Sequence, residues 1–302
     1  TAMRVLISGA SGMIGAALTK SFAEQGHDVL TLVRPESNRS GISWHPGVAL
    51  EDHPDLEGLD AVVHLAGAGI ADRRWTTARK NLLWHSRVES TAHLRSALEE
   101  RNAPPKRFLC ASAIGWYGHR DNDILDESSS PGHGFLANLC AAWESAAQSN
   151  TMASACLRFG LVLDRSGGAL KKMLPPFQLG LGGPLGSGRH WQSWIGLDDA
   201  VRHIMHLCTA PVEEVRGVHN VVAPEPIQQR DFASALGKAL KRPAWLPAPR
   251  WAVQLLFGDM AKEALLASTR VIPTRRLEEG PSFLNPDLEV ALRQALRKAS
   301  DR

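Results

Sequence analysis

The feature that most constrains this chain is a glycine-rich turn near its beginning, Ser8-Gly9-Ala10-Ser11-Gly12-Met13-Ile14-Gly15. A short apolar run, residues 4–8, precedes it, and Ile14, Leu18 and Phe22 then recur every four residues. These patterns predict a strand, a tight turn and a helix that ends at Gly26. A glycine turn placed between a strand and a helix is typical of proteins that bind the pyrophosphate of a dinucleotide.

Each glycine of the turn has its own task in such a site. Gly9 makes the tight turn, Gly12 lets backbone N–H groups approach the phosphates, and Gly15 lets the helix pack closely on the strand. The helix N-terminus adds partial positive charge. The alternative is a glycine turn that holds no ligand, and the position of the turn in a βαβ unit argues against it. We therefore predict that the cofactor is bound by Gly9, Ser11, Gly12, Met13, Ile14 and Gly15.

The end of the second predicted strand distinguishes between the two nicotinamide cofactors. NAD sites usually carry Asp or Glu at this point, where the carboxylate binds the ribose 2′-hydroxyl. Here the strand ends in Leu32-Val33-Arg34-Pro35, with Ser37 and Arg39 close behind. The guanidinium of Arg34 suits a 2′-phosphate, which predicts NADP(H) rather than NAD(H). The alternative is that Arg34 is a solvated surface residue.

Strand and helix patterns alternate through the first half of the chain. Strands are predicted at residues 4–8, 28–33, 42–44, 60–65, 107–112 and 153–163, and helices at 12–25, 76–101 and 135–148. Strands that alternate with helices of this length form parallel sheets through βαβ crossovers. We therefore expect an α/β fold with a doubly wound parallel sheet.

The pattern changes after residue 163. Residues 164–196 are rich in Gly and Pro and are predicted to be loop, with 179–188 lining a pocket. Asp198 and Asp199 precede a helical pattern and are predicted to cap it rather than bind a metal. Residues 217–223 give one more strand, and short helical stretches follow. We expect residues 3–165, with 196–223 returning to them, to form the dinucleotide domain, and residues 166–195 and 224–302 to form a smaller, mostly helical substrate lobe.

Small residues follow two further strands of the predicted sheet. Because small side chains at the carboxyl end of a strand let a cofactor pass close to the backbone, both places belong to the predicted site. The first holds Leu65, Ala66, Gly67 and Ala68, and the second holds Ala111 and Ser112.

Composition limits the partners and the compartment. The 34 basic and 31 acidic residues give a charge of +3, too small to predict a nucleic-acid partner. The apolar runs are shorter than a membrane span, so no membrane partner is expected. No signal segment is visible, and Cys110, Cys140, Cys156 and Cys208 form no close pair. Buried free thiols in a reducing, cytoplasmic compartment are the expectation. The 12 histidines show no metal-ligand spacing, so no metal is predicted.

Several motifs together resemble a known superfamily. The glycine turn, His64-Leu-Ala-Gly67 and Ser112-Ala-Ile-Gly-Trp-Tyr-Gly118 are similar to those of extended short-chain dehydrogenases/reductases. The stretches at 74–76, 192–199 and 267–277 resemble its epimerase-family branch, and the resemblance covers nearly the whole chain. It implies a Rossmann-type domain for the cofactor and a C-terminal lobe over a small-molecule substrate. Superfamily members often form dimers, so a homodimer is the oligomer to test.

The sequence departs from the superfamily pattern where chemistry is expected. Members use a Ser, a Tyr and a Lys four residues after the Tyr. The Tyr moves the substrate hydroxyl proton, and the Lys lowers the pKa of the Tyr and holds the nicotinamide ribose. When the corresponding helix is aligned on Glu144, the Tyr and Lys positions hold Leu136 and Cys140. Arg87 stands where a helix Asn is usual, and we include it among the cofactor-binding residues.

Two interpretations stay open. In the first, the chain is an NADP-dependent oxidoreductase or epimerase for a small hydroxyl- or carbonyl-bearing molecule, with a relocated acid–base group. Tyr117, the single tyrosine, and Ser112 are then the catalytic candidates, with Arg87 or His119 supplying charge. Tyr117 has an alternative role as a loop aromatic that packs against the cofactor or the substrate lobe. In the second interpretation, the chain has lost turnover and is an NADP(H)-binding sensor or regulatory protein.

Overall fold

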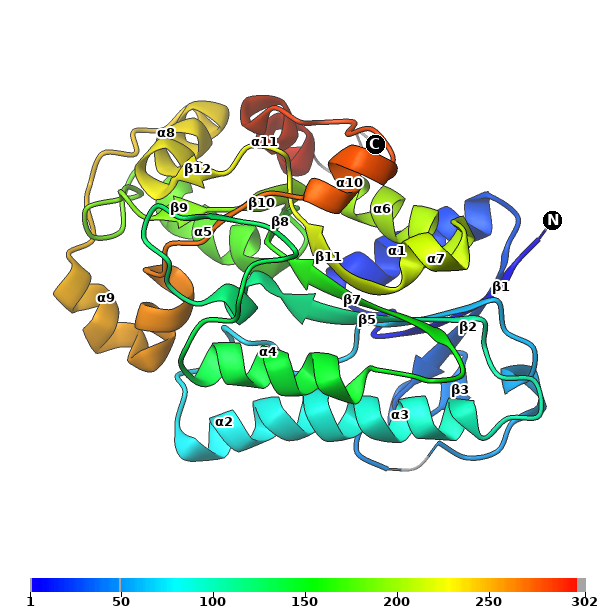
Figure 1. The fold of residues 1–302 in the computed structure, drawn as a ribbon. Helices are drawn as coiled ribbons and strands as arrows, with labels where there is room; N and C mark the ends of the chain where they lie inside the picture. The colour runs from blue at the N-terminus through cyan, green and yellow to red at the C-terminus, as the bar shows by residue number, and fades with distance from the viewer. Residues whose placement is uncertain (1, 49, 298–302) are drawn as a thin grey trace.

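A parallel sheet of seven strands lies at the centre of the computed structural model, which describes residues 2–48 and 50–297 (Figure 1). The strand order is β11-β7-β5-β4-β1-β2-β3, and every neighbouring pair is parallel. The order reverses between β1 and β4, where open sheets of this kind bind ligands. The strands are β1 (Arg4–Ser8), β2 (Asp28–Val33), β3 (Ile42–Ser43), β4 (Ala61–His64), β5 (Arg107–Ala113), β7 (Ala153–Phe159) and β11 (Gly217–Val221).

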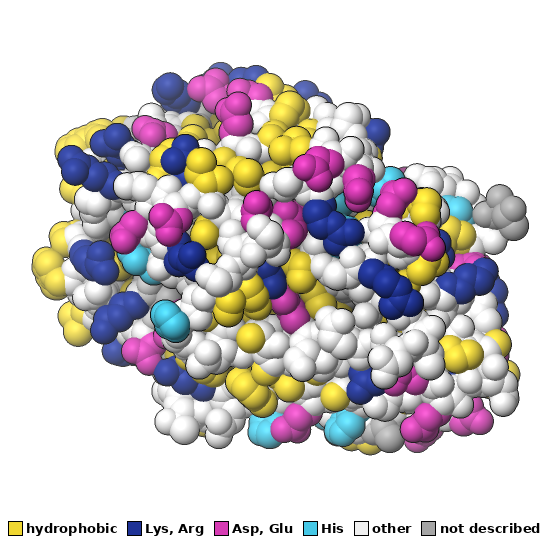
Figure 2. Space-filling view, in the orientation of Figure 1, with side chains coloured by type: hydrophobic (Ala, Val, Ile, Leu, Met, Phe, Trp, Pro, Cys, Tyr) yellow, Lys and Arg dark blue, Asp and Glu magenta, His cyan; other side chains and the backbone are white. Residues whose placement is uncertain are grey.

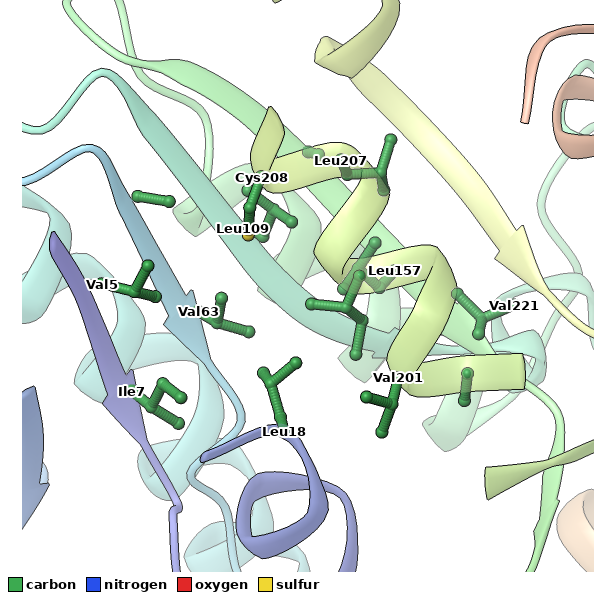
Figure 3. Close-up of a cluster of buried hydrophobic side chains, with 14 of the residues drawn as sticks. Val5, Ile7, Leu18, Val63, Leu109, Leu157, Val201, Leu207, Cys208 and Val221 are labelled. Atoms are coloured by element: carbon green, nitrogen blue, oxygen red, sulfur yellow. The ribbon is translucent and has the colours of Figure 1, made fainter. Parts of the chain in front are cut away.

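Helices cover both faces of this sheet. One face packs against α1 (Met13–Glu24) and α6 (Leu197–Thr209), and the other against α3 (Ser90–Glu99) and α4 (Phe135–Ala146). Successive strand residues point to opposite faces, so strands buried on both sides are apolar throughout. Figure 3 shows the first interface, where Val5, Ile7, Val63, Leu109 and Leu157 of the sheet meet Leu18 of α1 and Val201 of α6. The predicted α/β fold with a doubly wound parallel sheet is confirmed.

The predicted strand at residues 153–163 is divided in two. It breaks at Gly160, after which β8 (Leu161–Leu163) leaves the large sheet and pairs with β10 (Trp194–Gly196). The prediction of loop for 164–196 was wrong in part, because α5 (Gly168–Gln178) forms there despite containing Pro175 and Pro176. Its buried Leu170, Leu174 and Phe177 form one apolar face, and packing outweighs the two missing amide hydrogens.

The long helix predicted for residues 76–101 is present but irregular. It consists of α2 (Thr77–Trp84), the π-helical turn η2 (His85–Glu89) and α3. A π turn holds one residue more than an α turn, and such turns occur frequently at functional sites. Arg87 lies in the middle of this turn.

The C-terminal half adds a second group of helices beside the sheet. α8 (Gln229–Leu240) and α11 (Leu288–Leu296) pack with α5 around Phe232, Leu236 and Leu292. α9 (Arg250–Phe257) lies at the edge of the molecule (Figure 1). The remaining elements are η1 (Pro54–Leu56), η3 (Ile114–Tyr117), β6 (Ile124–Leu125), β9 (Trp191–Gln192), α7 (Val212–Val215), β12 (Ile227–Gln228), η4 (Ala261–Leu265), β13 (Arg270–Val271) and α10 (Thr274–Glu279).

Asp199 ties this C-terminal part to α6. The predicted cap was wrong, because Gly196 is the residue before the helix and Asp199 lies in its first turn. The buried Asp199 carboxylate accepts from Arg276 Nη2 at 3.0 Å and from the backbone N–H groups of Leu284 and Asn285 at 2.8 and 2.9 Å. The carboxylate therefore joins three segments rather than ending one helix.

The four cysteines are buried free thiols, as predicted. Burial raises the pKa of Cys110, Cys140 and Cys208 to about 12. At neutral pH these thiols are therefore protonated, which leaves them poor nucleophiles.

Candidate functional site

A cleft of about 370 Å³ opens where four strands of the large sheet end. Gly9 follows β1, Leu65 follows β4, residues 111–113 end β5, and Phe159 ends β7. The carboxyl ends of parallel strands share one edge, and the cleft includes the point where the strand order reverses. It therefore occupies the place where this architecture binds nucleotides.

The glycine turn forms one wall of the cleft, and its shape requires glycine. Gly9 has a φ of +71°, and a Cβ on it would lie 2.8 Å from the Leu65 carbonyl carbon. A Cβ on Gly15 would overlap the Gly9 carbonyl oxygen. The turn and the start of α1 are thus pressed together, which is the close helix–strand contact predicted for the third glycine.

The N-terminus of α1 faces the same cleft. Its first intrahelical bond runs from Ala16 N to Gly12 O at 2.8 Å. The N–H groups of Met13, Ile14 and Gly15 precede that bond, so they have no helical acceptor. All three residues line the cleft, where their N–H groups and the helix dipole suit a phosphate.

A buried polar chain fixes the loop after β4. Ser8 Oγ accepts hydrogen bonds from the N–H groups of Leu65 and Ala66 at 3.1 and 3.2 Å, and it lies 2.6 Å from His64 Nδ1. The serine hydrogen therefore goes to Nδ1, which leaves the hydrogen of Nε2 for Thr91 Oγ1 at 3.0 Å. Burial lowers the pKa of His64 to about 4, so the ring is neutral and holds the loop without adding charge.

Arg87 is a buried cation in the wall of the cleft. Its side chain donates from Nη2 to the Ala68 carbonyl at 2.8 Å and lies over the Trp143 ring, 5.1 Å from its centre. Burial lowers its pKa to about 10, so the group is still charged at neutral pH. No Asp or Glu within residues 2–48 and 50–297 forms an ion pair with it. A charge that is buried without an anion is costly, unless a ligand supplies one.

Ser112 lines the cleft, and its hydroxyl group is positioned by a hydrogen bond to a buried ion pair. Its Oγ donates to Glu144 Oε1 at 2.7 Å, and Arg158 donates to both carboxylate oxygens at 2.7 and 2.8 Å. Burial disfavours the charge on Arg158, but the hydrogen bonds and charge of Glu144 outweigh it and raise the pKa of Arg158. The hydroxyl hydrogen of Ser112 therefore points to Glu144, and its oxygen can accept a bond from the cleft.

Tyr117 lies outside the cleft. Its ring is fully buried, and its hydroxyl is 2.7 Å from Asn220 Oδ1, 2.9 Å from the Asp126 carbonyl oxygen and 3.0 Å from Arg158 Nη1, which donates to it. Burial raises the pKa of Tyr117 to about 12. A phenol enclosed in this way does not reach a substrate in the cleft, so its position argues against the acid–base role predicted from the sequence.

The other site residues predicted from the sequence, together with those described above, either line the cleft or lie outside its lining. Gly9, Gly12, Met13, Ile14, Gly15, Leu65, Arg87, Ala111 and Ser112 line the cleft together. Ser11, Arg34, Ala66, Gly67 and Ala68 lie outside its lining. His119 is on the surface, where its ring bonds to Asp121. The 179–188 segment does not line the cleft either, because it packs along residues 243–250.

One helix contributes half of the lining that sequence reasoning did not assign to the cofactor. Leu136, Leu139, Cys140 and Trp143 of α4 face the cleft, and Ile70, Ala113, Phe159 and Gly168 complete it. Leu136 and Cys140 stand at the superfamily's Tyr and Lys positions. Their alignment with that pattern could therefore have placed them in the cleft. The Glu144–Arg158 pair was missed because nothing in the sequence pattern shows that a helix residue and a strand residue meet.

Comparison with known proteins fixes the family. Residues 5–223 match the NAD dependent epimerase/dehydratase family, and residues 248–295 match a domain of unknown function, DUF1731. The chain belongs to the NAD dependent epimerase/dehydratase family. The resemblance to its epimerase-family branch is confirmed, since the matching relatives are themselves called epimerase family proteins.

The epimerase family proteins match along nearly their whole length, and one larger solved structure matches over part of its own. Epimerase family protein Mb2239 of Mycobacterium bovis is 39% identical over 95% of this chain and 96% of its own. Human epimerase family protein SDR39U1 is 37% identical over 97% and 99%. Its crystal structure with NADPH matches at 35% identity and a TM-score of 0.88, over 97% of this chain and 99% of that one. A nucleoside-diphosphate sugar epimerase from Corynebacterium glutamicum matches at 31% identity and a TM-score of 0.74, over 98% of this chain and 58% of that one.

Proposed function

We propose that this chain binds NADP(H) in the cleft at the carboxyl ends of β1, β4 and β5. The observation that carries the proposal is the fit of the glycine turn and the α1 N-terminus, which leave room and unpaired N–H groups for a pyrophosphate. The structure of human SDR39U1 was determined with NADPH, which supports the same cofactor here.

Arg34 would select the phosphorylated cofactor. Its side chain is 70% exposed directly after β2, and its one ion pair in the described chain, to Glu36, is loose at 3.8 Å. The guanidinium is therefore free to form a bidentate, charge-assisted contact with a 2′-phosphate.

We propose further that the cleft supports redox or epimerase chemistry on a small hydroxyl- or carbonyl-bearing molecule. Bound NADP(H) supplies a hydride donor or acceptor. Ser112 Oγ would accept a hydrogen bond from a substrate hydroxyl, because its own hydrogen is held by Glu144. The Arg87 guanidinium would stabilise negative charge on a substrate oxygen, since preformed positive charge in a largely apolar cleft is most effective there.

The positive charge of the superfamily pattern would then come from a different helix. Cys140 stands at the Lys position, and Arg87 lines the same cleft from the neighbouring π turn. A cation on η2 thus faces the place from which the α4 lysine is missing. We propose that Arg87 takes over the electrostatic part of that lysine's role.

The second candidate function is an NADP(H) sensor or regulatory protein without turnover. The observation that favours it is the pair Leu136 and Cys140, which line the cleft where an acid and a cation are expected. Leucine carries no proton to transfer, and burial keeps the Cys140 thiol protonated. Tyr117, the alternative acid, is enclosed elsewhere.

Calorimetric titration with NADPH, NADP⁺, NADH and NAD⁺ tests the cofactor. Arg34→Ala should weaken NADPH binding tenfold or more, because a charge-assisted contact contributes about 1.5–3 kcal/mol, and should leave NADH binding unchanged. Arg293→Ala, a change of another exposed arginine on α11, is the matched control. Equal affinity for NADPH and NADH would contradict the 2′-phosphate contact, and no binding of any dinucleotide would remove both candidate functions.

Turnover separates the two candidates. NADPH consumption is followed with a panel of aldehydes, ketones and oxo acids, using wild type and Ser112→Ala. Steady consumption that Ser112→Ala slows without changing NADPH affinity would support the enzyme. Because an epimerase returns its hydride and consumes no NADPH overall, tight NADPH binding with no consumption across the panel would exclude only the reductase. The sensor is favoured if hydroxyl-bearing substrates also keep their configuration.

A further inference from the structure

Helix α9 exposes large apolar side chains, which a surface helix normally turns toward the core. Trp251, Leu255 and Leu256 are 69%, 66% and 67% exposed, while Val253 packs inward against Ala261 and Leu266. Scattered apolar residues are normal on a surface, but several on one eight-residue helix are not. α9 therefore carries three largely exposed apolar side chains, and two of them, Trp251 and Leu255, are neighbours one helical turn apart.

Exposed apolar side chains also stand on the loop that leads into α9 and on the segment paired with it. Trp245 is 76% exposed, and Leu246 beside it donates from its backbone N–H to Gly182 O at 3.2 Å. This contact places residues 179–182 next to residues 245–246. We call the combined patch the α9 surface; it consists of Leu179, Leu181, Trp245, Leu246, Trp251, Leu255 and Leu256.

Positive charge accompanies the α9 surface. Residues 238–262 contain five Lys or Arg residues and one acidic residue, whereas basic and acidic residues nearly balance over the whole chain. Lys238, Lys241 and Arg242 line a shallow cleft of about 360 Å³ together with Trp245. Hydrophobic and basic side chains lie close together at the left edge of Figure 2, over α9 and the end of α8.

We propose that the α9 surface binds the face of an anionic lipid bilayer. Its Trp and Leu side chains would enter the headgroup region, and Lys238, Lys241 and Arg242 would contact lipid phosphates. No helix in the described part of the chain is long and apolar enough to cross a membrane, so the contact is peripheral. A helix that lies on the surface needs no spanning run, and so the sequence-based expectation of no membrane partner does not apply to it.

Charge argues against a second copy of the chain as the occupant. A two-fold contact places the same patch of both subunits together. The cations of residues 238–262 would then face one another, which is unfavourable, whereas an anionic bilayer complements them.

Vesicle binding tests the proposal with the full chain. Co-sedimentation is measured with phosphatidylglycerol vesicles and with phosphatidylcholine vesicles. Wild type should bind the anionic vesicles, and Trp251→Ser combined with Leu255→Ser should weaken that binding at least tenfold. Ile124→Ser, which changes an equally exposed residue on β6, should bind as wild type does. Unchanged NADPH affinity shows that each variant is folded.

The charge component has its own variants. Lys241→Glu combined with Arg242→Glu should remove the preference for anionic over neutral vesicles, while Lys20→Glu combined with Arg293→Glu should keep it. Absence of wild-type binding to anionic vesicles would overturn the proposal. So would a self-association in ultracentrifugation that Trp251→Ser abolishes in the absence of vesicle binding, because a second copy would then be the occupant.

Discussion

Two buried arginines near the cleft are stabilised in opposite ways. Arg158 makes a bidentate ion pair with Glu144, and its Nη1 donates to the Tyr117 hydroxyl. Arg87 has a carbonyl, a weak serine contact at 3.4 Å and an aromatic ring, but no carboxylate in the described chain. The fold alone explains the first arginine, and for the second we propose that a bound ligand supplies the anion.

Substitution should separate these roles. Arg87→Met removes an unpaired buried charge, so we expect the free energy of unfolding to stay level or rise, while NADPH affinity falls tenfold or more. Arg158→Met leaves Glu144 buried and unpaired, which should lower the free energy of unfolding by about 3–5 kcal/mol. Urea unfolding and calorimetric titration measure the two effects. If Arg87→Met destabilised the fold as Arg158→Met does, Arg87 would be a structural residue.

His64 makes the stability of the fold depend on pH. Burial lowers its pKa from about 6.5 to about 4, so the unfolded chain takes up the proton first as the pH falls. This contribution to stability is complete above pH 6.5 and is lost between pH 6.5 and 4. By pH 5 the loss is about 2 kcal/mol from this residue. Burial also lowers the pKa of His219 to about 4, which adds a loss in the same direction.

Chemical unfolding at pH 7 and pH 5 checks this prediction. His64→Gln should reduce the difference between the two pH values by about 2 kcal/mol and leave the part that comes from His219, whatever it does to stability at pH 7. His133→Gln, at an exposed position, should leave the difference as in wild type. An unchanged pH dependence in His64→Gln would assign the effect to other groups.

At the scale of elements, regular stretches were predictable and interruptions were not. β1 and β2 have the predicted bounds, because each is an apolar run that ends at a turn residue. α5 was missed because Pro175 and Pro176 outweigh its apolar spacing in the sequence. The π turn at His85–Glu89 has no local signature, since its residues read as ordinary helix.

The buried pair at the start of α6 holds the C-terminal segment in place. Asp199→Ala leaves Arg276 unpaired and removes the acceptor of two backbone N–H groups, so the free energy of unfolding should fall by about 3 kcal/mol or more. Asp198→Ala changes the exposed neighbour and should stay within about 0.5 kcal/mol of wild type. Urea unfolding measures the free energy of unfolding of both variants. Equal decreases would show that the Asp199–Arg276 ion pair does not hold the segment in place.

For the whole molecule, the sequence predicted the glycine turn that would bind the cofactor. It did not predict the contacts around Ser112, where a substrate would react. The glycine turn is local, so its residues were readable together. Ser112, Glu144 and Arg158 meet only through the sheet and α4, and that contact depends on packing. Tyr117 stands in a glycine-flanked loop of the sequence, which favoured it as the acid–base group, but folding encloses its ring between β6 and β11.

Cofactor binding should stabilise the entire fold. NADPH at a hundred times its dissociation constant adds about 2.7 kcal/mol by mass action, which raises the melting temperature on the order of 5 °C. Arg34→Ala should show a smaller rise at the same NADPH concentration and the same rise as wild type with NADH. Thermal melts followed by circular dichroism measure this, and a rise that NADPH produces equally in both proteins would separate Arg34 from the cofactor.

Because of the π turn, a single deletion in the gene could affect the cleft without affecting the core of the fold. Loss of a single codon within residues 85–89 would turn the π turn into an α turn and leave α2 and α3 as one continuous helix. The core contacts of Leu94 and Leu98 lie beyond the turn and would survive, whereas the guanidinium of Arg87 would leave the cleft. Homologues with such a three-base deletion would therefore keep the fold and lose the Arg87 guanidinium from the cleft.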